Sequence, residues 1–175
     1  MHVRPIAAAL LTLAVLLPGP APAQSIDDIN KAEAALDAAW AQLPLTIRHA
    51  TFVTAAPTGY GVYTARPDAK FKPGERIVAY AEPLGYAWKT NADGTYTFGF
   101  DVDVAIEAAD GTELQKQPNF AHLAFTSHAR NHEFMVTLDL DLTGAEPGNY
   151  IAAYTLRDIA SSKTATISLP FSIVQ

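Results

Sequence analysis

The sequence predicts a mostly β fold that is preceded by one amphipathic helix. Helical spacing of apolar residues occurs between residues 26 and 43. After Pro44, short segments of apolar and polar residues are separated by turns rich in Gly, Pro, Asn and Asp, and no second helical pattern follows. Short strands at this spacing are typical of a β-sandwich or a barrel.

The first 23 residues have the pattern of a secretory signal peptide. Arg4 gives a positive start, an apolar stretch runs from Ile6 to Leu17, and the small residues Ala21-Pro22-Ala23 precede Gln24. This order of features predicts cleavage after Ala23. An uncleaved anchor is the alternative, but the apolar stretch is short for a membrane span. We therefore expect export to the periplasm or the extracellular space, with no membrane span after cleavage.

The chain thus divides into a signal peptide (1–23), an N-terminal helix (24–44) and one β domain (45–175). The formal charge is −6 and no basic run occurs, which argues against nucleic acid and anionic membrane surfaces as partners. The chain has no cysteine, which excludes disulfides, thiol catalysis and cysteine-type zinc sites.

The N-terminal helix has recognisable start and stop signals. Ser25 is the expected N-cap, with Asp28 three residues later in a variant of the capping box. Pro44 ends the helix. Two interpretations stand: the helix packs Leu36 and Trp40 on the β domain, or it docks on a partner. The apolar residues that trace one face are Ile26, Ile29, Ala32, Leu36, Trp40 and Leu43.

One hairpin of the β domain has a predictable register. The turn that Gly94 closes suits a three-residue hairpin with this glycine in the left-handed region. This register places Trp88 opposite Phe98. Tyr86 then lies opposite Phe100, so all four rings share one face, which is more typical of a core than of a ligand platform. A slip by one residue would instead expose Trp88 and suit a sugar site. The candidate strands are Ile47–Thr54, Tyr60–Arg66, Arg76–Glu82, Gly85–Thr90, Thr95–Glu107, Phe120–Thr126, Glu133–Leu142, Tyr150–Arg157 and Thr164–Val174.

A tyrosine two residues after a glycine, at the start of a late strand, resembles the tyrosine corner of immunoglobulin-type sandwiches. Tyr150 is that tyrosine, and its hydroxyl is expected to bond backbone a few residues upstream. The stretches "FKPGERIVAYAEP" and "EPGNYIAAYTLRDIASSKTATISLPFSI" are similar to immunoglobulin-like modules of bacterial exported proteins, over about Phe71 to Val174. The resemblance implies an immunoglobulin-like antiparallel β-sandwich with Trp88 as its core tryptophan. It does not imply a function.

The run "FAHLAFTSHARNHEF" contains three of the five histidines. Alternating apolar residues predict that Phe120–Thr126 and Glu133–Leu142 form a hairpin. His122 then lies about 20 Å from His128 along the extended strand, at roughly 3.3 Å per residue. The three histidines therefore cannot share one metal ion in that hairpin.

The loop of this hairpin retains a candidate metal site. His128 and His132 are four residues apart, so one helical turn would bring them to the same side. Glu133 or Asn131 would complete a site for Cu(II) or Zn(II). The alternative is a solvated loop that carries surface histidines.

Other polar residues give weaker signals. The runs "DVDV" and "DLDL" are typical of strands with one wet face; if these strands were neighbours, their carboxylates would crowd around a cation such as calcium. Glu82 is interpreted as a solvated strand end, and His49 is given no role. The sequence lacks the nucleophile-elbow, zinc-protease, P-loop and dinucleotide motifs. A small hydrolase with a carboxylate pair is the enzymatic alternative.

These observations predict a non-catalytic, exported binding or adaptor protein of the bacterial cell envelope. Its partner would be another envelope protein or polymer, bound through loops or a free sheet edge. The alternative is a periplasmic copper- or zinc-binding protein that uses the loop of His128 and His132. No other cofactor is expected.

Overall fold

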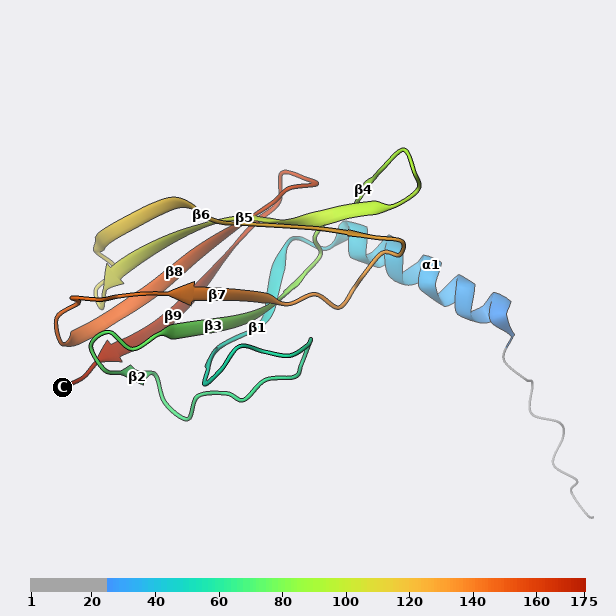
Figure 1. Ribbon diagram of the computed structural model, residues 1–175. Coiled ribbons are helices and arrows are strands. Elements are labelled where there is room, and N and C mark those ends of the chain that lie inside the picture. Colours follow the sequence, from blue (N-terminus) through green and yellow to red (C-terminus); the bar gives the residue numbers. More distant parts are fainter. Residues whose placement is uncertain (1–24) are drawn as a thin grey trace, which may run out of the picture.

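The computed structural model describes residues 25–175 (Figure 1). The predicted signal peptide, residues 1–23, lies outside the described residues. The described chain is mostly β, with one helix and two sheets. No helix within residues 25–175 combines the length and the apolar character needed to cross a membrane.

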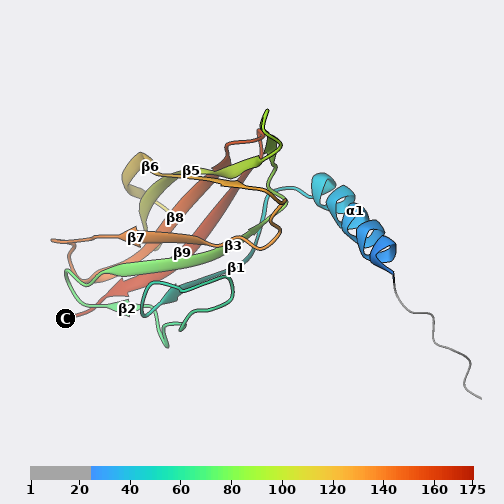
Figure 2. The same ribbon diagram turned by 45° about the vertical axis from the view of Figure 1, so that its right-hand side comes forward.

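Helix α1 (Ile26–Gln42) has the predicted capping box at its start. Ser25 Oγ accepts a hydrogen bond from the Asp28 N–H at 3.3 Å, and the Ser25 N–H donates to the Asp28 carboxylate at 3.1 Å. A cap of this kind stabilises a helix by about 1 kcal/mol. The helix ends just before Pro44 and projects from one end of the strands (Figures 1 and 2).

The strands form two sheets, which are antiparallel except for the pairing of β2 with β9. The smaller sheet has the order β1-β3-β7, and the larger has the order β2-β9-β8-β5, with both β4 and β6 paired to β5. The strands are β1 (Thr46–Val53), β2 (Lys70–Phe71), β3 (Ile77–Leu84), β4 (Lys89–Thr90), β5 (Tyr96–Ala108), β6 (Glu113–Ser127), β7 (Val136–Leu140), β8 (Gly148–Asp158) and β9 (Thr164–Ile173).

One apolar core lies between the two sheets, an arrangement compatible with a β-sandwich. Every second residue of a strand points inward, so each sheet contributes one face to this core. We call residues 45–175 the β body. Its central side chains are Ile77, Ala79 and Ala81 of β3, Phe98, Phe100, Val102 and Val104 of β5, Val136 and Leu138 of β7, and Ala152, Tyr154 and Leu156 of β8.

The β4–β5 hairpin has the predicted register. The Asn91 N–H donates to the Thr95 carbonyl at 2.8 Å, and Gly94 has a φ of 82°. Lys89 pairs with Thr97, so the next aromatic residues also lie opposite one another. The predicted aromatic face is part of the core, although Trp88 is only half-buried at its margin.

The predicted hairpin of Phe120–Thr126 with Glu133–Leu142 is wrong. Strand β6 begins earlier, at Glu113, and pairs with β5, whereas β7 pairs with β3 in the other sheet. The chain therefore crosses between the sheets after Ser127. Alternation shows which side chains share one face of a strand, but it does not select the neighbouring strand. Phe125, which was expected to face the core, is 46% exposed in the observed pairing.

Residues 54–69 form a loop over the outer face of the smaller sheet, so the predicted strand Tyr60–Arg66 is also wrong. This segment makes isolated bridges only. The Gly61 N–H donates to the Tyr80 hydroxyl at 2.8 Å, and this hydroxyl donates to the Glu82 carboxylate at 2.7 Å. Glu82 is 8% exposed and is therefore not the solvated strand end that was expected. Burial raises the pKa of Tyr80 to about 12.

Candidate functional site

Helix α1 has an apolar face that the β body does not cover. We call four residues the exposed face of α1: Ile26 (72% exposed), Ile29 (46%), Leu36 (46%) and the C-cap residue Leu43 (36%). The predicted packing of Leu36 on the β domain is therefore wrong. The helix extends past the ends of the strands, so its N-terminal part projects away from the β body (Figure 2). Uncovered apolar surface on an amphipathic helix is a typical docking element.

Trp40 fastens the helix to the β body and is the buried residue of α1. Its ring stacks on Trp88 at 5.6 Å and meets the edges of Tyr86 at 5.2 Å and His132 at 4.8 Å between centroids. Its Nε1–H donates to the Tyr86 carbonyl at 2.8 Å. We call the three partner residues the socket. Trp88 therefore packs against the helix and is not the central core tryptophan that was expected.

A polar cluster lies beside the socket. Asp37 Oδ2 lies 2.6 Å from Nη1 of Arg130, and its Oδ1 lies 3.1 Å from Nε2 of His132. The hydrogen bond from Arg130 to Asp37 raises the pKa of Arg130. The Tyr86 hydroxyl donates to the Asn131 carbonyl at 2.5 Å, which fixes the loop 128–132 to the core. These contacts hold the loop and the helix in one arrangement.

Lys163 caps the carboxyl end of α1. Its ammonium donates to the Leu43 carbonyl and to the Gly85 carbonyl, both at 2.7 Å. A cation at this end of a helix also interacts favourably with the helix dipole. Gly85 has a φ of +77°, and a Cβ atom there would lie 2.5 Å from the Pro44 carbonyl oxygen. Glycine therefore permits the close approach of the chain that leaves the helix.

A groove of about 490 Å³ lies between α1 and the loop 128–132. The helix contributes Glu33 and Leu36, and the β body contributes Tyr96 and His128. The guanidinium of Arg130 lies over the Tyr96 ring, 5.2 Å from its centroid. Because Leu36 belongs both to the groove and to the exposed face of α1, the two form one continuous surface. This surface is the candidate docking site.

The predicted metal ligands are not brought together. His128 is exposed in the groove, His132 lies in the socket beside Asp37, and Glu133 is exposed. Within residues 25–175, no three His, Asp or Glu side chains are grouped in a way that could hold a metal ion. Sequence reasoning missed Asp37 as the partner of this loop, because it lies in the distant N-terminal helix.

The two acidic runs lie in different sheets and do not crowd together. In β5, Asp101 Oδ1 lies 2.6 Å from Nδ1 of His122, and Asp103 pairs with Arg157. Asp139, of the second run, lies in β7. The geometry within the described residues therefore gives no support to a shared cation between the runs.

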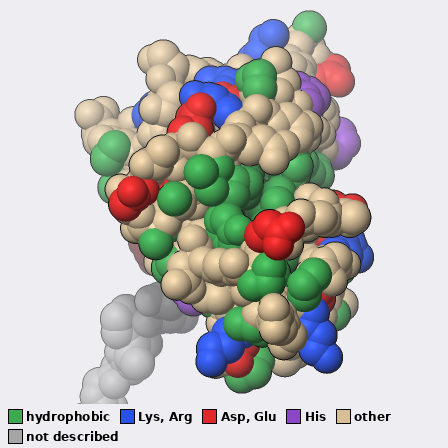
Figure 3. All heavy atoms as spheres, turned by 90° about the vertical axis from the view of Figure 1, so that its left-hand side faces the viewer, with side chains coloured by type: hydrophobic (Ala, Val, Ile, Leu, Met, Phe, Trp, Pro, Cys, Tyr) green, Lys and Arg blue, Asp and Glu red, His purple; other side chains and the backbone are tan. Residues whose placement is uncertain are grey.

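A hollow of about 230 Å³ lies at the end of the β body away from α1, between the edges of β6 and β7. We call it the end hollow. Figure 3 faces this end and shows hydrophobic side chains gathered across its middle, with acidic side chains close by. The lining residues are Val104, Ile106, Gln115, Gln117, Phe120, Asp139, Leu140, Asp141 and Leu142.

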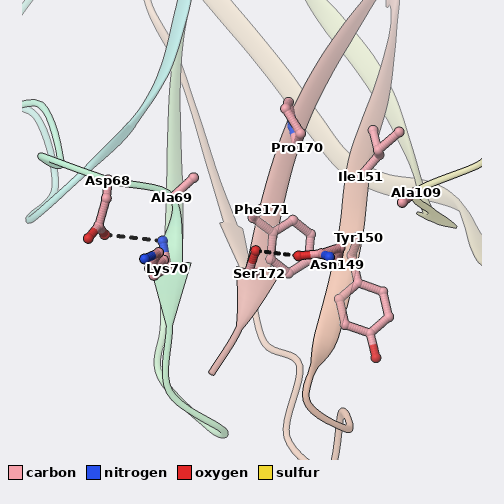
Figure 4. Close-up of a pocket in the computed structure, with 10 residues that line it drawn as sticks. All are labelled: Asp68, Ala69, Lys70, Ala109, Asn149, Tyr150, Ile151, Pro170, Phe171 and Ser172. Carbon is pink, nitrogen blue, oxygen red and sulfur yellow. Dashed lines mark hydrogen bonds between the residues drawn. The ribbon is translucent and has the colours of Figure 1, made fainter. Parts of the chain in front are cut away.

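A second open pocket of about 360 Å³ lies on β8 and β9 (Figure 4). Tyr150 stacks on Phe171 at 5.6 Å, and its hydroxyl donates to the Glu146 carbonyl at 2.8 Å. This is the hydrogen bond expected of a tyrosine corner. The hydroxyl points away from Asp68, whose carboxylate accepts from the Lys70 N–H at 3.1 Å (Figure 4). The pocket therefore has a structural tyrosine and an acid already engaged with backbone.

Comparisons with known proteins add no relative: a scan against protein-family models matched no family, and a search of curated proteins found no similar sequence. The functional argument therefore rests on the surfaces described above.

Proposed function

We propose that this chain is a non-catalytic, exported adaptor protein of the bacterial cell envelope that binds a partner protein through helix α1. The observation that carries the proposal is the exposed face of α1 on a helix that is anchored near its carboxyl end by Trp40. Burial of each exposed isoleucine or leucine would contribute about 1–2 kcal/mol, because each is still partly covered in the free protein. An anchored helix also loses less freedom on binding than a disordered segment.

The strand order supports an immunoglobulin-like β body as the scaffold of this adaptor. Strands β1, β3 and β7 match A, B and E of that fold, and β5, β6, β8 and β9 match C, C′, F and G. The hydrogen bond of Tyr150 supports the same reading. Immunoglobulin-like folds serve many binding functions, so the site and not the fold carries the proposal.

The charge of α1 favours one kind of partner. Asp27, Asp28, Glu33 and Asp37 outnumber Lys31, so the helix is acidic beside its apolar face. A partner protein whose binding groove is apolar at its base and basic at its rim would complement this helix. A second copy of α1 or an anionic bilayer would repel it. The signal-peptide pattern of residues 1–23 supports a partner in the envelope.

Photo-crosslinking in a cell-envelope extract tests the proposal. A photoreactive residue at Ile29 samples the exposed face, and one at Ala38 samples the opposite side, because nine residues turn a helix by about 180°. Ala38 is itself exposed. We expect one defined adduct from position 29 and none from position 38.

Substitutions then identify the surface that binds. Leu36→Asp should abolish the adduct at position 29, whereas the matched control Ala38→Asp should retain it. Circular dichroism at 222 nm must show that both variants keep the helix. Equal adducts from positions 29 and 38, or an adduct that survives Leu36→Asp in a folded helix, would contradict the proposal.

A further inference from the structure

The end hollow lies between two edge strands that differ in how well they are protected against pairing with a further strand. Strand β6 borders it on one side, but Pro118 lacks a backbone N–H and Asn119 has a φ of 51°, which interrupt the edge. Lys116 adds a charge. Proline, irregular backbone and lysine are the usual protection of an edge strand against a further strand.

Strand β7 borders the hollow on the other side and has none of these devices. Its sequence VTLDL contains no Pro, Gly or Lys, and it pairs with β3 on one side only among the described residues. Its inward side chains, Val136, Leu138 and Leu140, are buried, and Leu140 also lines the hollow. A strand added beside β7 would direct every second side chain toward Val104 and Ile106.

The rim of the hollow is acidic. Asp139 and Asp141 both line it. Asp139 is paired with Arg76 at 2.7 Å but is about half exposed, whereas the Asp141 carboxylate accepts only from Thr143 within the described residues. Acids along an edge favour basic residues opposite them and oppose like-charged residues, including the same edge of a second copy.

We infer that the free edge of β7 and the end hollow bind an extended segment of a partner protein by β-strand addition. The segment is apolar at every second position, to fill the hollow, and basic at positions that meet Asp139 and Asp141. Main-chain hydrogen bonds to β7 give affinity, and the hollow selects the side chains. This inference does not depend on α1, which lies at the other end of the β body (Figure 1).

A peptide of about seven residues that alternates lysine and valine is the probe, titrated into the full mature chain and followed by backbone amide NMR. We expect shifts of residues 136–140 and of the hollow. A scrambled peptide of the same composition should bind at least tenfold more weakly. A third peptide, N-methylated on the edge that faces β7, should not bind, because its hydrogen bonds are blocked.

The charge rim is tested with the double variant Asp139→Lys and Asp141→Lys. It should lose at least tenfold in affinity for the basic peptide. Asp27→Lys, which reverses a single charge on α1, should stay within twofold. An unchanged amide spectrum of the core shows that each variant is folded. No binding at millimolar peptide, equal binding of the scrambled peptide, or shifts at β6 or α1 in place of β7 would overturn the inference.

Discussion

Replacement of Trp40 by alanine would remove the side chain that holds α1 on the β body. The indole is 6% exposed, packs against the socket and donates a hydrogen bond to the Tyr86 carbonyl. No other residue of α1 is buried within the described chain. We therefore expect Trp40→Ala to undock the helix and not merely to shift it.

The magnitude follows from these contacts. Burial of a large apolar side chain contributes about 2–3 kcal/mol, and the hydrogen bond contributes about 1 kcal/mol more. The remaining ion pair between Asp37 and Arg130 is partly exposed and contributes less than about 1 kcal/mol. Trp40→Ala should therefore lower the free energy of unfolding by about 3–4 kcal/mol, within the usual range for such a change. A free helix of 17 residues is marginal in water, so the undocked α1 should melt.

Fluorescence and circular dichroism together measure this outcome. The protein has two tryptophans, and both lie at the contact of helix and β body, so Trp88 becomes the single reporter in the variant. We expect red-shifted Trp88 emission, weaker ellipticity at 222 nm and a lower urea midpoint. The control Trp40→Phe keeps an aromatic ring and should lose only about 1 kcal/mol. Full helical ellipticity in Trp40→Ala, with a loss below about 1 kcal/mol, would refute the reasoning.

Three further predictions test the scaffold. A left-handed φ costs a non-glycine residue about 1–2 kcal/mol, and Gly85→Ala should destabilise the protein by more than this because its Cβ would lie 2.5 Å from a carbonyl oxygen. The control Gly94→Ala has open space around its Cβ and should show only the cost of its φ. Equal decreases in melting temperature for the two variants would contradict this prediction. Tyr150→Phe should lose about 1 kcal/mol in urea unfolding, and an unchanged midpoint would remove its structural role. The backbone N–H of Asn119 holds the pKa of Asp103 below its ordinary value of 3.8. The stabilising contribution of Asp103 is therefore present above pH 3.8 and is lost as the pH falls through the lower pKa of the folded protein. Asp103→Asn should be less stable than the wild type at neutral pH and equally stable in strong acid. A difference in unfolding free energy that stays constant with pH would exclude this linkage.

Local signals in the sequence are sufficient to predict several elements. The capping box needs only Ser25 and Asp28, and the hairpin turn needs only the left-handed glycine at Gly94. The hydroxyl bond of Tyr150 reaches four residues upstream, which is also a local contact. Each of these features depends on residues close in the chain, where spacing alone specifies the geometry.

The predictions failed for contacts between residues that are far apart in the sequence. The alternation of Leu123 and Phe125 predicted a core-facing side, but Leu123 is only half-buried and Phe125 is 46% exposed. The strand that contains them, β6, pairs with β5 and not with β7. Arg130 meets Asp37 across 93 residues of sequence. The helical spacing likewise predicted that Leu36 lies on the apolar face of α1. It does not show which part of that face the β body covers. Contacts of this kind depend on the packing of the whole chain.

The two proposed surfaces have a spatial relation that suits an adaptor. Strand β5 begins at Tyr96, which borders the groove beside α1, and reaches Val104, which lines the end hollow. Eight residues of extended strand separate these positions by about 26 Å. The intervening core is close-packed and fully buried at Phe100 and Val102, so a segment bound at one end does not touch a partner at the other. Two partners held in this way are joined by a rigid sheet, which fixes their separation without requiring any conformational change in the β body.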